Sequence, residues 1–186
     1  MRALIFWPVL LFVVLLDVIS KAIAVAALTP ASYVTRQVIG DAVRFTLVYN
    51  PGAAFGLHLG TYSRWIFMAL TIGALIILWR LYKQTAQEDL RRAAAIALVS
   101  AGAIGNLIDR IKSSSGVVDF IDIGFGVHRW PTFNVADMAV STGAFLLAFV
   151  LWGEEQDAKP VSGTADASTA GPDHLIVKRP DATEIS

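Results

Sequence analysis

The chain has 186 residues, which suits a single domain, and 55% of them are hydrophobic whereas only 16% are charged. Its 15 basic and 15 acidic residues balance, so the net charge favours neither a nucleic acid nor an acidic ligand as a partner. Cysteine is absent and the three histidines are scattered without an HExxH pair, which excludes disulfides and thiolate sites and disfavours a histidine metal site, a zinc protease included.

Long apolar blocks predict an all-α membrane protein with four transmembrane helices, because a span needs about 20 helical residues. The four blocks cover residues 3–28, 62–82, 93–111 and 135–152. The third block is rich in Ala and Gly, whose small side chains let helices pack closely in lipid. Residues 1–152 are thus predicted to form one membrane-embedded domain, and the polar residues 153–186 a flexible cytoplasmic tail.

The first block has two interpretations. Met1 and Arg2, an apolar run and "AVA" at 24–26 are similar to a cleavable signal peptide. Asp17 and Lys21 interrupt the sequence before that cleavage site and favour a retained helix instead. The two residues are four apart with the acid first, so they share a helix face and can form an ion pair, whose role is either structural or functional.

The connections between the blocks differ in charge. Four basic residues lie close together at the end of the second block and in the connection after it, namely Arg80, Lys83, Arg91 and Arg92. Residues 113–132 contain only one Lys or Arg, Arg129. The positive-inside rule then places residues 80–92 and both termini in the cytoplasm, and residues 29–61 and 113–132 outside. Partial alternation of apolar and polar residues within 29–61 predicts short strands or an interfacial helix there.

Two polar motifs lie at the predicted outer surface. "VYNPGAAFG" (48–56) places Asn50 before Pro-Gly, which indicates either an ordinary turn or a loop that brings an amide close to an extended ligand. "GNLIDR" (105–110) ends the third span, and its spacing lets Asn106, Asp109 and Arg110 face the same neighbour. Polarity at a helix end explains the arginine, but an asparagine a full turn inside that end favours a function.

Two further motifs each carry an aspartate. "VVDFID" (117–122) is a β-prone stretch with Asp119 and Asp122, and "FNVAD" (133–137) begins the fourth span. Asn134 at the N-cap and Asp137 at the third helical position form a capping-box-like start, which alone is a sufficient local explanation. However, Asp17, Asp109, Asp119 and Asp137 all map to one membrane level, and ionisable groups inside a membrane usually mark function.

Because the chain has no cysteine, no plausible histidine dyad and no zinc motif, the most plausible catalytic groups are two carboxylates that share a proton, as in an aspartic-protease dyad. Two non-enzymatic functions compete with this interpretation. A transporter or proton-conducting protein with Asp17, Asp109 and Asp137 as a relay predicts acids spread through the membrane depth. A structural subunit needs the Asp–Lys and Asn–Arg contacts only as polar links between helices.

Five motifs, taken together and in order, resemble the bacterial lipoprotein signal peptidases (signal peptidase II). They are "DVISK" (17–21), "NPGAAFG" (50–56), "GNLIDR" (105–110), "VVDF" (117–120) and "FNVAD" (133–137). The resemblance covers about residues 3–152. It implies an aspartic endopeptidase of the bacterial cytoplasmic (inner) membrane that needs no cofactor or metal. Such enzymes cleave a prolipoprotein before its diacylglyceryl-modified cysteine and free the signal peptide.

The resemblance also implies roles for the motif residues. Asp119 and Asp137 are the implied catalytic pair; Asn50, Gly52, Asn106, Arg110 and Asn134 are the implied substrate-binding residues; and Asp17, Lys21, Asp109 and Ala136 are the implied supporting residues. The implied partners are lipid-modified prolipoproteins, membrane lipid and cyclic lipopeptide inhibitors of the globomycin type. The family's segment between spans one and two forms a small sheet with an interfacial helix, and its site lies near the outer (periplasmic) face. The helix N-terminus favours an ionised Asp137, so we expect Asp119 to hold the shared proton.

Overall fold

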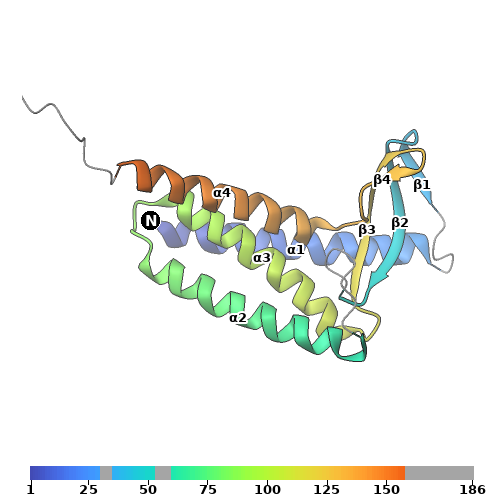
Figure 1. Cartoon of the computed structure of the whole chain (residues 1–186), viewed down its shortest axis with the longest axis horizontal. Coiled ribbons are helices and arrows are strands. Elements are labelled where there is room, and N and C mark those ends of the chain that lie inside the picture. Colours follow the sequence, from blue (N-terminus) through green and yellow to red (C-terminus); the bar gives the residue numbers. More distant parts are fainter. Residues whose placement is uncertain (30–34, 53–59, 158–186) are drawn as a thin grey trace, which may run out of the picture.

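The computed structural model describes residues 1–29, 35–52 and 60–157. Four helices run along one axis, with a small sheet at the end away from the N-terminus (Figure 1): α1 (Arg2–Leu28), α2 (Ser63–Gln84), α3 (Leu90–Lys112) and α4 (Val135–Asp157). All four are long and apolar enough to cross a membrane, so the predicted four-span fold is confirmed. Helix α4 ends later than the predicted boundary at residue 152, and residues 158–186 of the predicted tail lie outside the described residues.

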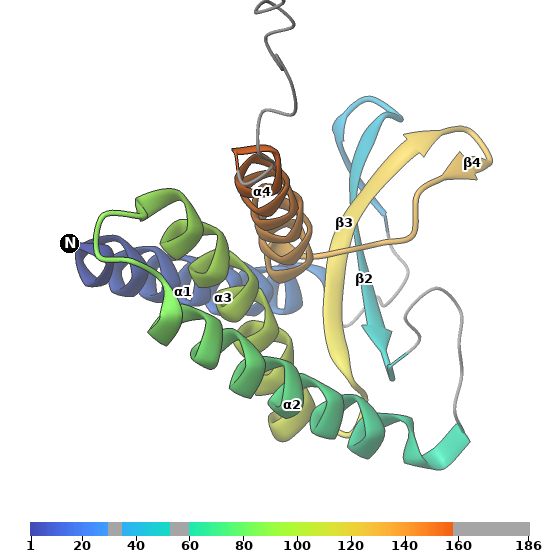
Figure 2. The same cartoon turned by 60° about the vertical axis from the view of Figure 1, so that its left-hand side comes forward.

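The sheet is antiparallel and its strands lie in the order β1-β2-β3-β4. These strands are β1 (Arg36–Ile39), β2 (Val43–Asn50), β3 (Val117–Phe125) and β4 (His128–Arg129). Strands β1 and β2 confirm the predicted strands after the first helix, and the sheet draws its other half from the segment after α3 (Figure 2). A short 3₁₀ helix, η2 (Gly60–Tyr62), precedes α2, and the expected interfacial helix stays a prediction because residues 30–34 and 53–59 lie outside the described part.

Helix α3 is the central helix, and it packs against α1, α2 and α4. Its small residues permit this, as predicted. A Cβ atom on Gly102 would lie 2.2 Å from the carbonyl oxygen of Ala136 in α4. A Cβ atom on Gly105 would lie 2.4 Å from Oδ2 of Asp17 in α1. The three helices therefore approach one another as closely as their backbones allow.

Two apolar clusters form the core, and polar residues separate them along α1. One cluster contains Phe6 and Val13 and fills the bundle; the other contains Ala24 and packs under the sheet. Asp17 and Lys21 are buried between the two clusters. The polar residues are therefore held inside the protein at the junction of bundle and sheet.

The contact at Gly102 generates a test of the fold. Gly102→Ala should lower the free energy of unfolding by about 1–3 kcal/mol, because the new methyl group meets backbone that cannot move aside. Thermal unfolding in detergent micelles measures the effect. Gly73→Ala in α2 is the matched control, since a Cβ there has nothing within 4 Å and alanine favours the helix by about 0.5–1 kcal/mol. An equal change in the free energy of unfolding in both variants would contradict the close contact between Gly102 and α4.

Candidate active site

The Lys21 ammonium group lies at the centre of the polar cluster. Its Nζ atom is 2.8 Å from an oxygen of Asp17 and 2.8 Å from an oxygen of Asp109, and it donates a 3.0 Å hydrogen bond to Oδ1 of Asn106. Lys21 is 3% exposed and Asp17 is fully buried. The predicted ion pair within α1 is thus confirmed, and the same lysine also joins α1 to the outer end of α3.

Asp17 connects this cluster to the start of α4. Its Oδ1 atom accepts a 2.8 Å hydrogen bond from the backbone N–H of Ala136. The first N–H groups of a helix lack partners within the helix, so the carboxylate satisfies one of them and its charge is favourable at that end. Ala136 therefore takes part through its backbone, and α1 fixes where α4 begins.

The predicted capping box is present at the same helix start. The backbone N–H of Asp137 donates to Oδ1 of Asn134 at 2.9 Å, and the backbone N–H of Asn134 donates to Oδ2 of Asp137 at 3.2 Å. These reciprocal bonds fix both side chains in the first turn of α4.

Asparagine side chains hold the two candidate catalytic carboxyls. The amide of Asn134 donates to Oδ1 of Asp119 at 2.7 Å, and the amide of Asn50 donates to Oδ2 at 3.1 Å. The amide of Asn106 donates to Oδ1 of Asp137 at 2.8 Å. Since Asn134 also bonds to Asp137, one residue touches both carboxyls. The structure thereby brings strand β3 and helix α4 together at this asparagine.

The environment of Asp119 favours its protonated form. The side chain is 3% exposed, and burial, reinforced by the negative charge of Asp137, raises the pKa of Asp119 to about 7. Hydrogen bonds from Asn50 and Asn134 oppose this rise without cancelling it. A carboxyl that carries a proton near neutral pH can donate that proton during a reaction.

Asp122, three residues further along β3, has a different environment. Burial acts to raise its pKa, but hydrogen bonds from Arg129 and Arg44 outweigh burial and hold the pKa below its usual value. Both arginines donate to its carboxylate directly. Asp122 therefore links the strands of the sheet as a permanent anion, and its neighbour Asp119 is the carboxyl that faces the polar cluster.

The remaining predicted residues lie around the same cluster. Gly52 donates its N–H to Oδ1 of Asn50 at 3.0 Å and has a φ of 119°, so the predicted turn is confirmed. Asp109 accepts a 3.2 Å hydrogen bond from the backbone N–H of Val118, which positions β3 beside α3. Every predicted site residue thus lies in the region where α1, α3, β3 and α4 meet.

Arg110 is where one sequence expectation is wrong. Asn106 and Asp109 share a neighbour, since both contact Lys21 of α1. Arg110 instead lies over the ring of Phe67 in α2, 5.6 Å from its centroid. The reason is that α3 is central and presents successive positions to different helices. The Nε atom of Arg110 is buried and has no hydrogen-bond partner in the described part of the chain.

Sequence reasoning missed Arg64, at the start of α2. Its Nε atom donates to the carbonyl oxygen of Arg110 at 2.6 Å, and it donates a second bond to the carbonyl oxygen of Ile111 at 3.2 Å. These bonds cap the end of α3 and hold Arg110 in place. No motif marks Arg64, because its partners are backbone atoms of a distant helix end.

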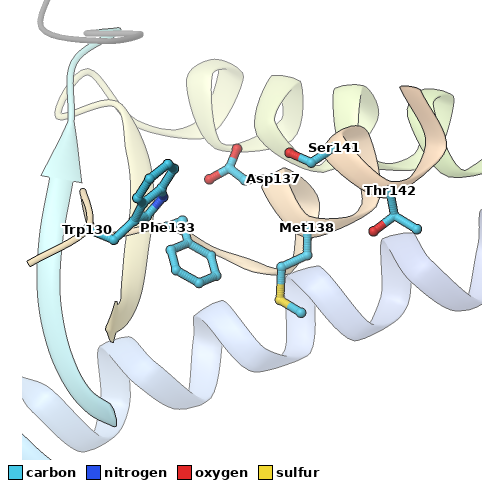
Figure 3. A pocket seen from close by; sticks show the side chains of 6 residues that line it. All are labelled: Trp130, Phe133, Asp137, Met138, Ser141 and Thr142. Carbon is cyan, nitrogen blue, oxygen red and sulfur yellow. The ribbon is translucent and has the colours of Figure 1, made fainter. Parts of the chain in front are cut away.

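Two pockets meet at Asp137. The first has a volume of about 290 Å³ and is lined by Trp130, Phe133, Asp137, Met138, Ser141 and Thr142; Figure 3 shows these side chains around the start of α4. The second, of about 330 Å³, is a groove between α2, α3 and α4. Its apolar wall includes Phe67, Leu70, Ala74 and Leu78 of α2. Its polar lining consists of Thr71, Asn106, Arg110 and Asp137. Ligand atoms can therefore reach Asp137 from two sides.

Comparisons with known proteins agree with one another. The family model described as signal peptidase (SPase) II matches residues 9–152. The lipoprotein signal peptidase of Burkholderia mallei (strain SAVP1) is 38% identical over 141 residues, which cover 75% of this chain and 82% of that protein. The lipoprotein signal peptidase of Cupriavidus taiwanensis is 41% identical over 141 residues, which cover 74% of this chain and 76% of that protein.

Solved structures show the same likeness. A bacterial membrane enzyme determined by the in meso method at 2.3 Å resolution has a TM-score of 0.71 and 34% identity, and the match covers 84% of this chain and 92% of that one. A second such enzyme, at 1.9 Å resolution, has a TM-score of 0.66 and 37% identity over 77% of this chain and 89% of that one. The likeness thus extends over the helices and the sheet.

The pKa of Asp119 predicts how stability changes with pH. Because its pKa is about 7 in the folded protein and its ordinary value is 3.8, the folded state binds more protons than the unfolded state between these values. The free energy of unfolding should therefore fall as the pH rises from about 4 to about 7, and stay level above. Thermal unfolding of Asp119→Asn should lack this fall.

The pH dependence of stability in Asp137→Asn tests the second cause of the raised pKa of Asp119. Removing the charge of Asp137 removes the second cause of the raised pKa and leaves burial in place. The fall in stability should therefore persist in Asp137→Asn, but it should be smaller and end at a lower pH. An unchanged fall in Asp119→Asn would show that another group is responsible.

Proposed function

Because the chain belongs to the signal peptidase II family, we propose that it is a membrane aspartic endopeptidase that removes signal peptides from prolipoproteins. The bond cleaved is the one before a diacylglyceryl-modified cysteine, Asp119 and Asp137 are the catalytic pair, and water is the nucleophile. The observation that supports this most strongly is the pair of hydrogen bonds by which Asn134 contacts both carboxyls.

The proposed mechanism starts with one proton on the pair, held by Asp119. Ionised Asp137 takes a proton from water, whose oxygen attacks the scissile carbonyl carbon, while Asp119 gives its proton to the carbonyl oxygen. Asp137 then donates its proton to the leaving nitrogen as the C–N bond breaks. Asp119 recovers a proton from a hydroxyl of the tetrahedral intermediate, which leaves a carboxylic acid product and the pair as it began.

The hydrogen bonds of Asp137 suit this assignment. Its two oxygens accept hydrogen bonds from the amide of Asn106 and the backbone N–H of Asn134, and such bonds stabilise the charge of a carboxylate. Its position in the first turn of α4 also favours a negative charge.

The two pockets suggest how a substrate lies across the pair. Wall residues from Phe67 to Leu78 extend the groove over about three turns of α2, so it suits the apolar signal-peptide segment. The pocket beside Trp130 then receives the lipid-modified cysteine. We assign Arg110 to the substrate backbone, because Arg110 lines the groove and its Nε donor has no partner within the described residues. Asn50, Gly52, Asn106 and Asn134 line the same site, and Asp17, Lys21, Asp109 and Ala136 support it.

We propose that the protein lies in the bacterial cytoplasmic (inner) membrane with both termini in the cytoplasm. The N-terminus and the connection between α2 and α3 lie at the end away from the sheet (Figure 1). That end carries the group of basic residues around the connection between α2 and α3, including Arg80, Arg91 and Arg92. The site then lies near the outer (periplasmic) face, where water meets lipid and where globomycin-type cyclic lipopeptides also have access.

The competing functions explain less. A proton relay needs acids at several depths, but Asp17 and Asp109 both contact Lys21 at one end of the bundle. A structural subunit accounts for these ion pairs. It gives no reason for Asp119, a buried carboxyl whose hydrogen bonds come from the amides of Asn50 and Asn134.

Asp119→Asn and Asp137→Asn test the proposed pair. Each should lower the rate of cleavage of a diacylglyceryl-modified prolipoprotein by at least about a hundredfold, because each removes a proton donor or acceptor. Cleavage is measured with purified protein in lipid, and thermal unfolding shows whether each variant is folded.

The matched control is Asp89→Asn at the other end of the bundle. Asp89 caps α3 by accepting from the N–H of Arg92, and asparagine caps a helix equally well. Normal cleavage is therefore expected. Near-normal cleavage by either Asp119→Asn or Asp137→Asn would restrict that aspartate to a structural role.

Ala74→Trp tests the groove, because the indole occupies space beside Leu70 and Leu78. We expect a higher KM with little change in kcat, since binding and not chemistry is affected. Ile77→Trp is the control, because this residue is 60% exposed on the same helix and does not line the groove. A similar KM for both variants would place the signal peptide elsewhere.

A further inference from the structure

A third apolar pocket lies away from the candidate active site, at the end of α1 nearest the sheet. It has a volume of about 350 Å³. Helix α1 contributes Ser20, Ile23, Ala24, Ala27 and Leu28, and the sheet contributes Arg36, Phe45 and Phe120. The lining is carbon except for the hydroxyl of Ser20, the guanidinium group of Arg36 and backbone atoms.

The pocket exists because α1 changes from large to small side chains. Earlier in the helix the exposed positions carry bulky groups, among them Phe12, Leu15 and Ile19. At Ala24 and Ala27 only methyl groups are present, so the surface between the helix and the sheet is recessed. This recess lies in the last turns of a membrane-spanning helix, where acyl chains approach their headgroups.

Arg36 provides a cation at the edge of the recess. It lies in β1, opposite Phe45 of β2, and its side chain is exposed. Among the residues that the structure describes, no hydrogen bond or ion pair engages it. The neighbouring arginine of the sheet, Arg44, is in contrast held by Asp41 and Asp122. A free guanidinium group beside an apolar recess complements a phosphate attached to an acyl chain.

We propose that this recess binds one acyl chain of a bilayer phospholipid whose phosphate pairs with Arg36. The chain lies against Ala24 and Ala27, and the phosphate lies at the level of β1. The guanidinium fork recognises the phosphate oxygens, whereas the recess recognises only apolar volume.

The bound lipid would support the strand that carries Asp119. Phe120 follows Asp119 in β3, and its ring lies 6.0 Å from the ring of Phe45. An acyl chain in the recess covers the exposed side of the Phe45 ring and extends the apolar cluster beneath the sheet, which contains Phe120. The lipid therefore stabilises the folded protein, and this consequence does not depend on peptidase activity.

The test uses full-length protein stripped of lipid in detergent and titrated with dioleoylphosphatidylglycerol. The unfolding midpoint should rise, and native mass spectrometry should show one retained lipid. Phosphatidylcholine, which also carries a phosphate, should act similarly. Dioleoylglycerol, which lacks a phosphate, should need an about tenfold higher concentration, the effect of one charge-assisted hydrogen bond. Arg36→Gln should remove this difference between the lipids, and Arg36→Lys should keep part of it.

Ala27→Phe fills the recess and should abolish the rise in the midpoint. Ala26→Phe is the matched control: it adds the same ring at the next exposed position, outside the lining, and should respond like the natural sequence. Equal responses of the natural sequence, Arg36→Gln and Ala27→Phe would overturn the proposal and show general annular lipid only. If Ala27→Phe fails to fold, the lipid selectivity of Arg36→Gln decides the question.

Discussion

The buried ammonium group of Lys21 is the constraint on which the other contacts depend. A charge at membrane level is costly unless its surroundings neutralise it and satisfy its hydrogen bonds. Lys21 meets this requirement with oxygens from Asp17, Asp109 and Asn106, which fixes α1 against α3. The two acids also accept from backbone N–H groups, Asp17 from the start of α4 and Asp109 from the start of β3. One cation thus sets the relative positions of two further elements, and these elements carry the candidate catalytic carboxyls.

Within this framework, Asn134 positions both candidate catalytic carboxyls. Its backbone and side chain cap α4 together with Asp137, and its amide reaches Asp119. Both carboxyls are therefore positioned by the residue that starts the helix, without a charged partner on Asp119. The contrast within β3 is informative, because Asp122 has two arginine partners and Asp119 has amides. Burial acts to raise the pKa of both carboxyls; the arginine partners of Asp122 overcome this effect, whereas the amide partners of Asp119 do not.

Local spacing explains what the sequence predicted correctly. Lys21 lies four positions after Asp17, and Asp137 lies three positions after Asn134. Side chains at these spacings meet within one helix, so the sequence predicts the ion pair and the capping box directly. Apolar length likewise located the four spans. The motifs identified the polar residues that meet at one site. The face of Arg110, the bonds of Arg64 and the pockets depend on how helices pack, and no local pattern encodes that packing.

The two carboxyls differ because they belong to different secondary structures. Asp137 occupies a helix start, where unpaired N–H groups and the helix dipole favour a negative charge. Asp119 occupies a strand buried between α1 and the polar cluster, where little water stabilises a charge. A pair made from two helix starts, or from two buried strands, would lack this difference. The chain places a sheet against the ends of its helices, and burial at this junction gives Asp119 a site that favours the acid. The burial that a membrane fold requires is therefore also the source of the asymmetry that acid–base chemistry needs.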